Sequence, residues 1–118
     1  MPTSFHDHYE YTDGRRQPLL TRIRREILEL DKDKRLTERA TAGHRIAYSK
    51  PDRKVFLEVK VQRHAIVLHM IDVPDPDHIL SNIPESHGWG QLTGRVKIES
   101  NPELERVLPL VRNAWLRG

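Results

Sequence analysis

A loop at positions 72–92 holds the residues with the clearest potential for chemistry. Its motif His87-Gly88-Trp89-Gly90 places an indole between two glycines, which permit positive φ angles and close approach of the backbone. A tryptophan in that position can stack on a base or another ring. Alternatively, Trp89 folds back over the edge of a sheet and fills part of the core. Together with Tyr48, the residues His87 and Trp89 form our predicted ligand-binding set.

The same loop combines acidic residues with histidines: Asp72, Asp75, Asp77 and Glu85 lie near His78 and His87. A histidine and a carboxylate can form a general acid–base pair. However, the sequence shows no nucleophile elbow, phosphate-binding loop or metalloprotease helix. We therefore leave enzymatic activity open, favour its absence and predict no catalytic residue.

Metal binding is a further possibility, because the chain has seven histidines. His6-Asp7-His8 could chelate a divalent ion, and so could His78 with Asp75 or Asp77. Neither cluster has the spacing of a zinc site, and the chain has no cysteine to supply a thiolate. We interpret these histidines as surface residues and expect no metal and no cofactor.

Five arginines and no acidic residue fall within residues 15–25, namely Arg15, Arg16, Arg22, Arg24 and Arg25. Such a group of cations can neutralise phosphates, so these five residues form our predicted nucleic-acid-binding set. The alternative is a solvated helix face whose arginines pair with Glu26, Glu29 or the acidic loop.

Helical spacing of apolar residues predicts a helix over residues 18–30, with Pro18 at its start. Residues 1–14 lack such periodicity, and we expect an N-terminal arm that Phe5, Tyr9 and Tyr11 either order in part or leave frayed. The charged segment 31–43 is expected to form a turn and a short helix.

Alternation of apolar and polar residues predicts strands around residues 46–48 and 96–98 and over residues 55–61 and 65–71. The polar face of these strands carries Lys60, Arg95 and Lys97, and Glu58 and Glu99 lie nearby. A brief helix is expected at residues 78–82. A final helix begins near Asn101, and Pro109 should kink it near Glu105.

These elements predict an α+β fold, in which an antiparallel sheet of about four strands carries an N-terminal and a C-terminal helix on one face. Residues 15–118 would form a single domain. The apolar face of each element supplies the predicted core: Leu20, Ile23, Ile27, Val59, Leu68, Val96, Leu108 and Val111.

Composition and the pattern of apolar residues indicate the compartment in which we expect the protein to act. The chain of 118 residues carries 20 Lys and Arg against 17 Asp and Glu, a formal charge of +3. No apolar run approaches the roughly 18 residues that a membrane span needs, and the first ten residues do not resemble a signal peptide. We expect a cytoplasmic protein with no membrane partner.

Several short motifs occur in an order that resembles a known family. They are Leu30-Asp31, Ile46-Ala47-Tyr48, Phe56-Leu57-Glu58-Val59, His87-Gly88-Trp89-Gly90 and residues 110–115. Over residues 15–117 the chain resembles a bacterial and archaeal domain-of-unknown-function family often labelled "predicted transport protein". Similar domains occur alone or attached to nuclease-like proteins of defence systems, so the resemblance implies a nucleic-acid context.

The sequence thus favours a small non-catalytic binding module that engages nucleic acid or a protein that acts on nucleic acid. The alternative is a small enzyme or small-ligand receptor with its site between the Trp89 loop and the sheet. The ligand, the oligomeric state and the pathway are left open by the sequence.

Overall fold

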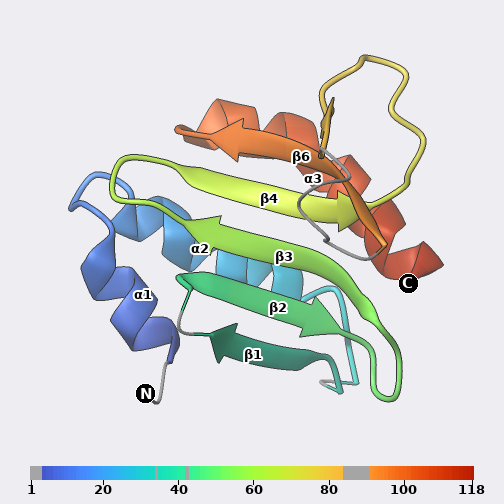
Figure 1. The fold of residues 1–118 in the computed structure, drawn as a ribbon, viewed down its shortest axis with the longest axis horizontal. Helices are drawn as coiled ribbons and strands as arrows, with labels where there is room; N and C mark the ends of the chain where they lie inside the picture. The colour runs from blue at the N-terminus through green and yellow to red at the C-terminus, as the bar shows by residue number, and fades with distance from the viewer. Residues whose placement is uncertain (1–3, 34, 42, 84–90) are drawn as a thin grey trace.

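The structure, a computed structural model, describes residues 4–33, 35–41, 43–83 and 91–118. Figure 1 shows the helices and strands in this part of the chain. In order they are α1 (Phe5–Tyr11), α2 (Gln17–Leu28), β1 (Thr37–Thr41), β2 (Arg45–Ser49), β3 (Val55–Val61), β4 (Ile66–Ile71), β5 (Ser81–Asn82), β6 (Leu92–Ile98) and α3 (Asn101–Arg117).

The strands form one sheet in the order β1-β2-β3-β4-β6-β5, with every neighbouring pair antiparallel. Helices α2 and α3 lie behind this sheet in Figure 1, and α1 lies at one end of it. The α+β class and the antiparallel sheet are therefore confirmed. The sheet has six strands among the described residues rather than about four.

Strand β1 lies in the segment for which we expected a turn and a short helix. Its residues are mostly polar, and such a sequence does not show the alternation of a half-buried strand. The pairing of Glu38 with Tyr48 and of Ala40 with Ile46 places it against β2 instead. The tertiary pairing therefore outweighs the local propensity of this segment.

Strand β5 replaces the brief helix that we expected at residues 78–82. The carboxylate of Asp75 accepts the backbone N–H groups of Ile79 and Leu80 at 2.9 and 2.8 Å. His78 has a positive φ of 52°, which is incompatible with a right-handed helix. The chain then leaves this turn extended and pairs Asn82 with Gly94 of β6.

The N-terminal segment contains a helix, α1, although its sequence lacks periodicity. A reciprocal cap begins it, since the Ser4 hydroxyl accepts the N–H of Asp7 and the Asp7 carboxylate accepts the N–H of Ser4. Immediately after the helix, the buried Thr12 donates its hydroxyl to the carbonyl of Gln62 at 2.7 Å. This contact ties the segment to the β3–β4 connection.

Helix α2 begins at Gln17, close to the predicted start, and ends at Leu28. Just before it, one carboxylate oxygen of Asp13 accepts the backbone N–H of Arg16 at 2.9 Å. The other lies 2.8 Å from Nδ1 of His64, and this hydrogen bond is the main reason that the pKa of Asp13 is lowered.

The core lies between the sheet and the two long helices. Of the predicted core residues, Leu20, Ile23, Ile27, Val59, Leu68 and Val111 are buried, whereas Val96 and Leu108 are partly buried at its margin. The register of β2 and β3 shifts where Tyr48 faces Leu57 and Ser49 faces Val55. Phe56 is the extra residue of this bulge, and both Phe56 and Leu57 are buried.

Helix α3 runs without a break through Pro109, which is exposed. The helix therefore tolerates its missing backbone donor on the solvent side. Near its end, Trp115 meets Phe56 edge to face at a centroid distance of 5.7 Å, and the ammonium of Lys50 lies 4.7 Å from the Trp115 ring.

Replacing Val59 by Asp would place an unpaired carboxylate in the centre of the core. We expect Val59→Asp to lower the free energy of unfolding by roughly 3 kcal/mol or more, as measured by urea denaturation. Thr37→Asp, at an exposed position of β1, is the matched control and should change it little. Cooperative unfolding of Val59→Asp at the wild-type midpoint would contradict this packing.

Candidate functional site

The predicted ligand-binding residues have different positions in the structure. His87 and Trp89 lie outside the described residues. Tyr48 is only 1% exposed, and its hydroxyl donates to Glu38 Oε2 at 2.7 Å. The buried Tyr48 side chain therefore belongs to a partly buried polar network rather than to an open surface.

Arg24 completes this network, which we call the Arg24–Glu38–Tyr48 triad. The Arg24 Nε and Nη2 atoms donate to the two carboxylate oxygens of Glu38, each at 2.9 Å. Burial, followed by the negative charge of Glu38, raises the pKa of Tyr48 above its ordinary value. The hydrogen bonds to Glu38 likewise raise the pKa of Arg24. The triad joins α2 to β1 and β2 through charge-assisted bonds.

The other arginines of the predicted nucleic-acid-binding set are divided between ion pairs and solvent. Arg16 lies 3.4 Å from Asp13 and 3.5 Å from Glu99. Arg22 lies 3.3 Å from Glu105 and 3.9 Å from Glu26, the partner expected from helical spacing. Arg15 and Arg25 are exposed. The structure thus does not assemble these five side chains into one continuous cationic surface.

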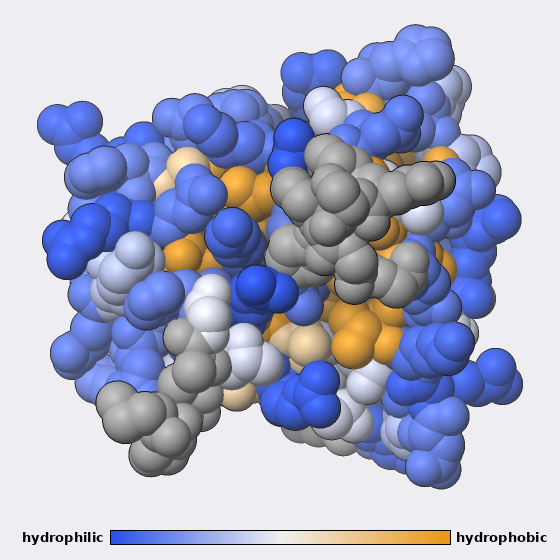
Figure 2. Space-filling model, viewed as in Figure 1, coloured by the Kyte–Doolittle hydropathy of each residue, from blue (hydrophilic) through white to orange (hydrophobic). Residues whose placement is uncertain are grey.

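A different set of cations gathers on the sheet face that is turned away from α2 and α3. Side chains alternate along a strand, so the neighbours of the buried Ile46, Val59 and Leu68 point to this opposite face. We call its five cations the basic sheet face: Arg39, Arg45, Lys60, Arg95 and Lys97. Figure 2 shows this side of the molecule, where hydrophilic residues surround smaller hydrophobic areas.

Two rows run across this face from strand to strand. In the first, Arg45 stands opposite Lys60, Lys60 opposite Val67, and Val67 opposite Lys97. Neighbouring strands are about 4.8 Å apart, so the backbone positions in this row span roughly 14 Å. This row brings three cations together without an acidic residue between them.

The second row places one acidic residue and one histidine between two arginines. Its order is Arg39, Ala47, Glu58, His69, Arg95. Glu58 Oε1 lies 3.8 Å from Nδ1 of His69 and 4.0 Å from Nη1 of Arg45.

The two rows border a pocket of about 350 Å³ next to β5. We call it the sheet pocket, and it is lined by Lys60, Gln62, Val67, His69, Ile79, Ser81, Arg95, Val96 and Lys97. Three cations and several hydrogen-bonding groups thus converge on one concave site, a combination suited to a phosphate group.

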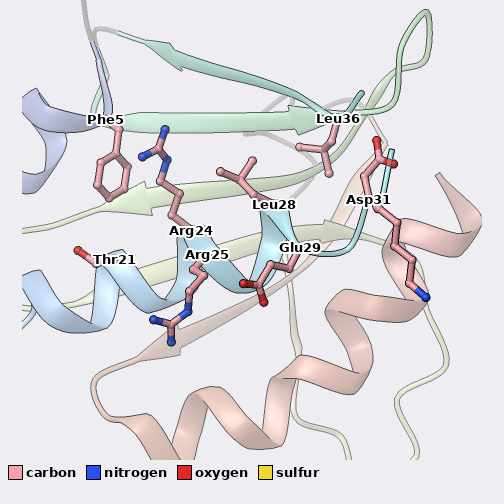
Figure 3. Close-up of a pocket in the computed structure, with 9 residues that line it drawn as sticks. Phe5, Thr21, Arg24, Arg25, Leu28, Glu29, Asp31 and Leu36 are labelled. Atoms are coloured by element: carbon pink, nitrogen blue, oxygen red, sulfur yellow. The ribbon is translucent and has the colours of Figure 1, made fainter. Parts of the chain in front are cut away.

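A second and larger pocket, of about 570 Å³, lies on the helix side of the molecule. Figure 3 shows this α2 pocket, in which Phe5, Arg24, Leu28 and Leu36 gather between α2 and the neighbouring strands. The complete lining is Phe5, Thr21, Arg24, Arg25, Leu28, Glu29, Asp31, Lys32 and Leu36. No sequence pattern indicates this pocket, because its residues come from three separate segments.

The described residues offer neither a membrane-spanning helix nor a cluster of metal ligands. None of their helices is both long enough and apolar enough to cross a bilayer. In the same part of the chain, no three His, Cys, Asp or Glu side chains are grouped so that they could hold a metal ion.

Comparison with family models, curated proteins and solved structures finds no match to this chain. The resemblance noted from its motifs therefore stays a prediction, and the site must be interpreted from its own geometry.

The raised pKa of Tyr48 gives stability a specific dependence on pH. Below the ordinary tyrosine value of 10.0, both folded and unfolded chains keep the phenol protonated, so its ionisation has no effect. Above it, the unfolded chain loses this proton more readily, and the free energy of unfolding should fall as pH rises. We expect Tyr48→Phe to reduce this decline.

At neutral pH, Tyr48→Phe should itself lower the free energy of unfolding by about 1.5–3 kcal/mol, because a partly buried hydrogen bond to a charged group is lost. Urea denaturation at several pH values measures both effects. Tyr9→Phe is the control, since Tyr9 is partly exposed. Equal pH dependence of the wild type and Tyr48→Phe would show that Tyr48 titrates as an ordinary tyrosine.

Proposed function

We propose that this protein is a small binding module that engages nucleic acid through the basic sheet face. One observation carries the proposal: five cations share one side of the sheet with a single described strand carboxylate, that of Glu58. The formal charge of the whole chain is only +3. The segregation of charge, rather than its total, therefore supports a polyanionic ligand.

Like charges that stand close together on the basic sheet face oppose folding, and a polyanionic ligand would offset this repulsion. Arg45 and Lys60 stand directly opposite each other in neighbouring strands, where like charges destabilise a sheet, and Glu58, which lies 4.0 Å from Arg45, offsets part of this repulsion. Phosphates placed over the two residues would convert this repulsion into attraction. Because the strands hold the backbone positions of these cations at fixed spacings, the fold already meets the part of the entropic cost of binding that comes from the backbone.

The sheet pocket favours a single strand over a duplex. Its volume of about 350 Å³ can admit a nucleotide that is not stacked in a helix, whereas base pairing in a duplex would keep nucleotides out. Lys60, Arg95 and Lys97 would contact phosphates, and Gln62 and Ser81 can donate or accept hydrogen bonds. Contacts of this type fix the backbone and give little sequence preference.

The family resemblance implies that similar domains occur attached to nuclease-like proteins, and this expectation agrees with a role in nucleic-acid binding. A protein partner that itself acts on nucleic acid remains compatible with the same surface, because an acidic protein segment would meet the same cations. The two ligands differ in the number of counterions that they release, and the salt dependence of binding separates them.

A small enzyme is the second candidate function, and one observation favours it. His69 lines the sheet pocket, and its Nδ1 atom lies 3.8 Å from Oε1 of Glu58, a separation that would have to shorten to hydrogen-bond distance for direct proton transfer. Incubation with labelled RNA and DNA oligonucleotides tests this alternative. A cleavage activity that is lost in His69→Gln would favour the enzyme, and intact oligonucleotides would favour binding alone.

We expect the wild-type protein to bind single-stranded oligonucleotides with an affinity that falls steeply with salt. The triple variant Lys60→Ala, Arg95→Ala, Lys97→Ala should decrease the steepness of log K against log salt by roughly two, because about 0.7 counterions are released per phosphate contact on a single strand. Fluorescence anisotropy at several salt concentrations measures this slope.

The matched control is Arg106→Ala, Arg112→Ala, Arg117→Ala, which removes the same charge from exposed positions of α3. It should leave the slope nearly unchanged. An equal decrease of the salt slope in the two triple variants would indicate a response to net charge and would contradict a defined site. A decrease of the salt slope that occurs only in the double variant Arg15→Ala, Arg25→Ala would instead place the contact on residues 15–25.

A further inference from the structure

The α2 pocket has walls that are mainly apolar. Phe5, Leu28 and Leu36 are only partly buried, and each packs on the core with part of its surface. The rest of that surface faces the concavity, where all three side chains gather (Figure 3). A ligand that covered them would remove this apolar surface from water, which is a favourable step.

The pocket also contains a cation whose orientation is fixed. The Arg24 guanidinium lies 4.4 Å above the Phe5 ring, while its Nε and Nη2 atoms are held by Glu38. Its Nη1 atom makes no hydrogen bond within the described part of the chain. An oxygen anion can therefore meet N–H groups that are already in position, at little further cost in side-chain entropy.

Charges around the opening add to this preference for an anion. Arg25 and Lys32 are exposed lining residues. The carboxylate of Asp31 is occupied locally, since its two oxygens accept the backbone N–H groups of Asp33 and Arg35 at 2.9 and 2.7 Å. Glu29 is the other acidic residue in the lining, so cations outnumber acids there.

We propose that the α2 pocket binds a small amphipathic anion: a compact apolar body, aromatic or branched aliphatic, that carries one carboxylate or sulfonate. The volume of about 570 Å³ lies in the usual range for small-molecule sites. A docking helix would need a row of apolar anchors along a groove, whereas this pocket offers three large apolar side chains. Binding in the α2 pocket is independent of nucleic-acid binding at the sheet pocket, because the two pockets share no lining residue.

Anilinonaphthalene sulfonate is a suitable probe, because it combines an aromatic body with one anionic group. We expect saturable binding at one site, with enhanced fluorescence and with chemical-shift changes in the backbone amides of residues 21–36 in two-dimensional NMR spectra. Near-ultraviolet circular dichroism must stay native on addition of the probe, so that binding to partly unfolded protein is recognised.

Leu28→Gln removes an apolar wall and keeps the side-chain length, and it should weaken binding by about tenfold or more. Leu116→Gln is its control, because Leu116 is 68% exposed on α3 and lies outside the pocket; it should bind as the wild type does. Arg25→Gln with Lys32→Gln should weaken binding of the sulfonate several-fold, and should leave binding of uncharged phenylnaphthylamine unchanged.

Three results would overturn the proposal. The first is equal affinity of Leu28→Gln and the wild type for the probe. The second is equal binding of the charged and the uncharged compound, which would remove the anion from the assignment. The third is a concentration-dependent dimer, seen by sedimentation and lost in Leu28→Gln, which would assign the surface to a second copy of the chain.

Discussion

Burial of one face of the sheet beneath two helices is the constraint on which the rest of the structure depends. Side chains alternate along each strand. Because Ile46, Val59 and Leu68 are buried under α2 and α3, the residues next to them in sequence project from the opposite face of the sheet. A slip of one residue would exchange Val59 for Lys60 and bury a cation. The burial of apolar side chains that forms the core therefore also places the cations on one surface and fixes their backbone positions.

The edge of the sheet at β1 needs a different kind of attachment, because this strand has few apolar side chains. Glu38 stands in the row of Tyr48 and Leu57, which faces the helices. A carboxylate in this place would be costly without partners. Arg24 supplies the opposite charge and Tyr48 a hydrogen bond, so the loss of Arg24 would leave the carboxylate without its ion-pair partner. Because Arg24 also lines the α2 pocket, the attachment of β1 and the shape of that pocket depend on one network.

The sequence was informative where a single periodicity dominated. The alternation around Val59 and the helical spacing of Leu20, Ile23 and Ile27 correctly indicated strand β3 and helix α2. β1 was missed because its position comes from pairing with β2. α1 was missed although the Ser4 and Asp7 spacing is a capping signal, since a short helix has weak periodicity.

The same distinction applies to the candidate sites. Lys60, Arg95 and Lys97 were visible on the polar face of predicted strands, but Arg39 could not join them without knowledge of β1. A run of arginines in the sequence suggested one surface, yet Arg16, Arg22 and Arg24 each lie beside an acidic residue from elsewhere in the chain or on the same helix. Linear clustering shows which charges are available, and only the fold shows which of them remain exposed together.

The shortness of β5 affects how the molecule behaves at high concentration. A strand at the border of a sheet is a template on which another chain can pair and start a fibre. β5 has two residues, so a foreign strand could gain very few main-chain bonds there before the ladder ends. Length alone therefore limits pairing of a foreign strand with β5 itself, independently of the charges that surround it.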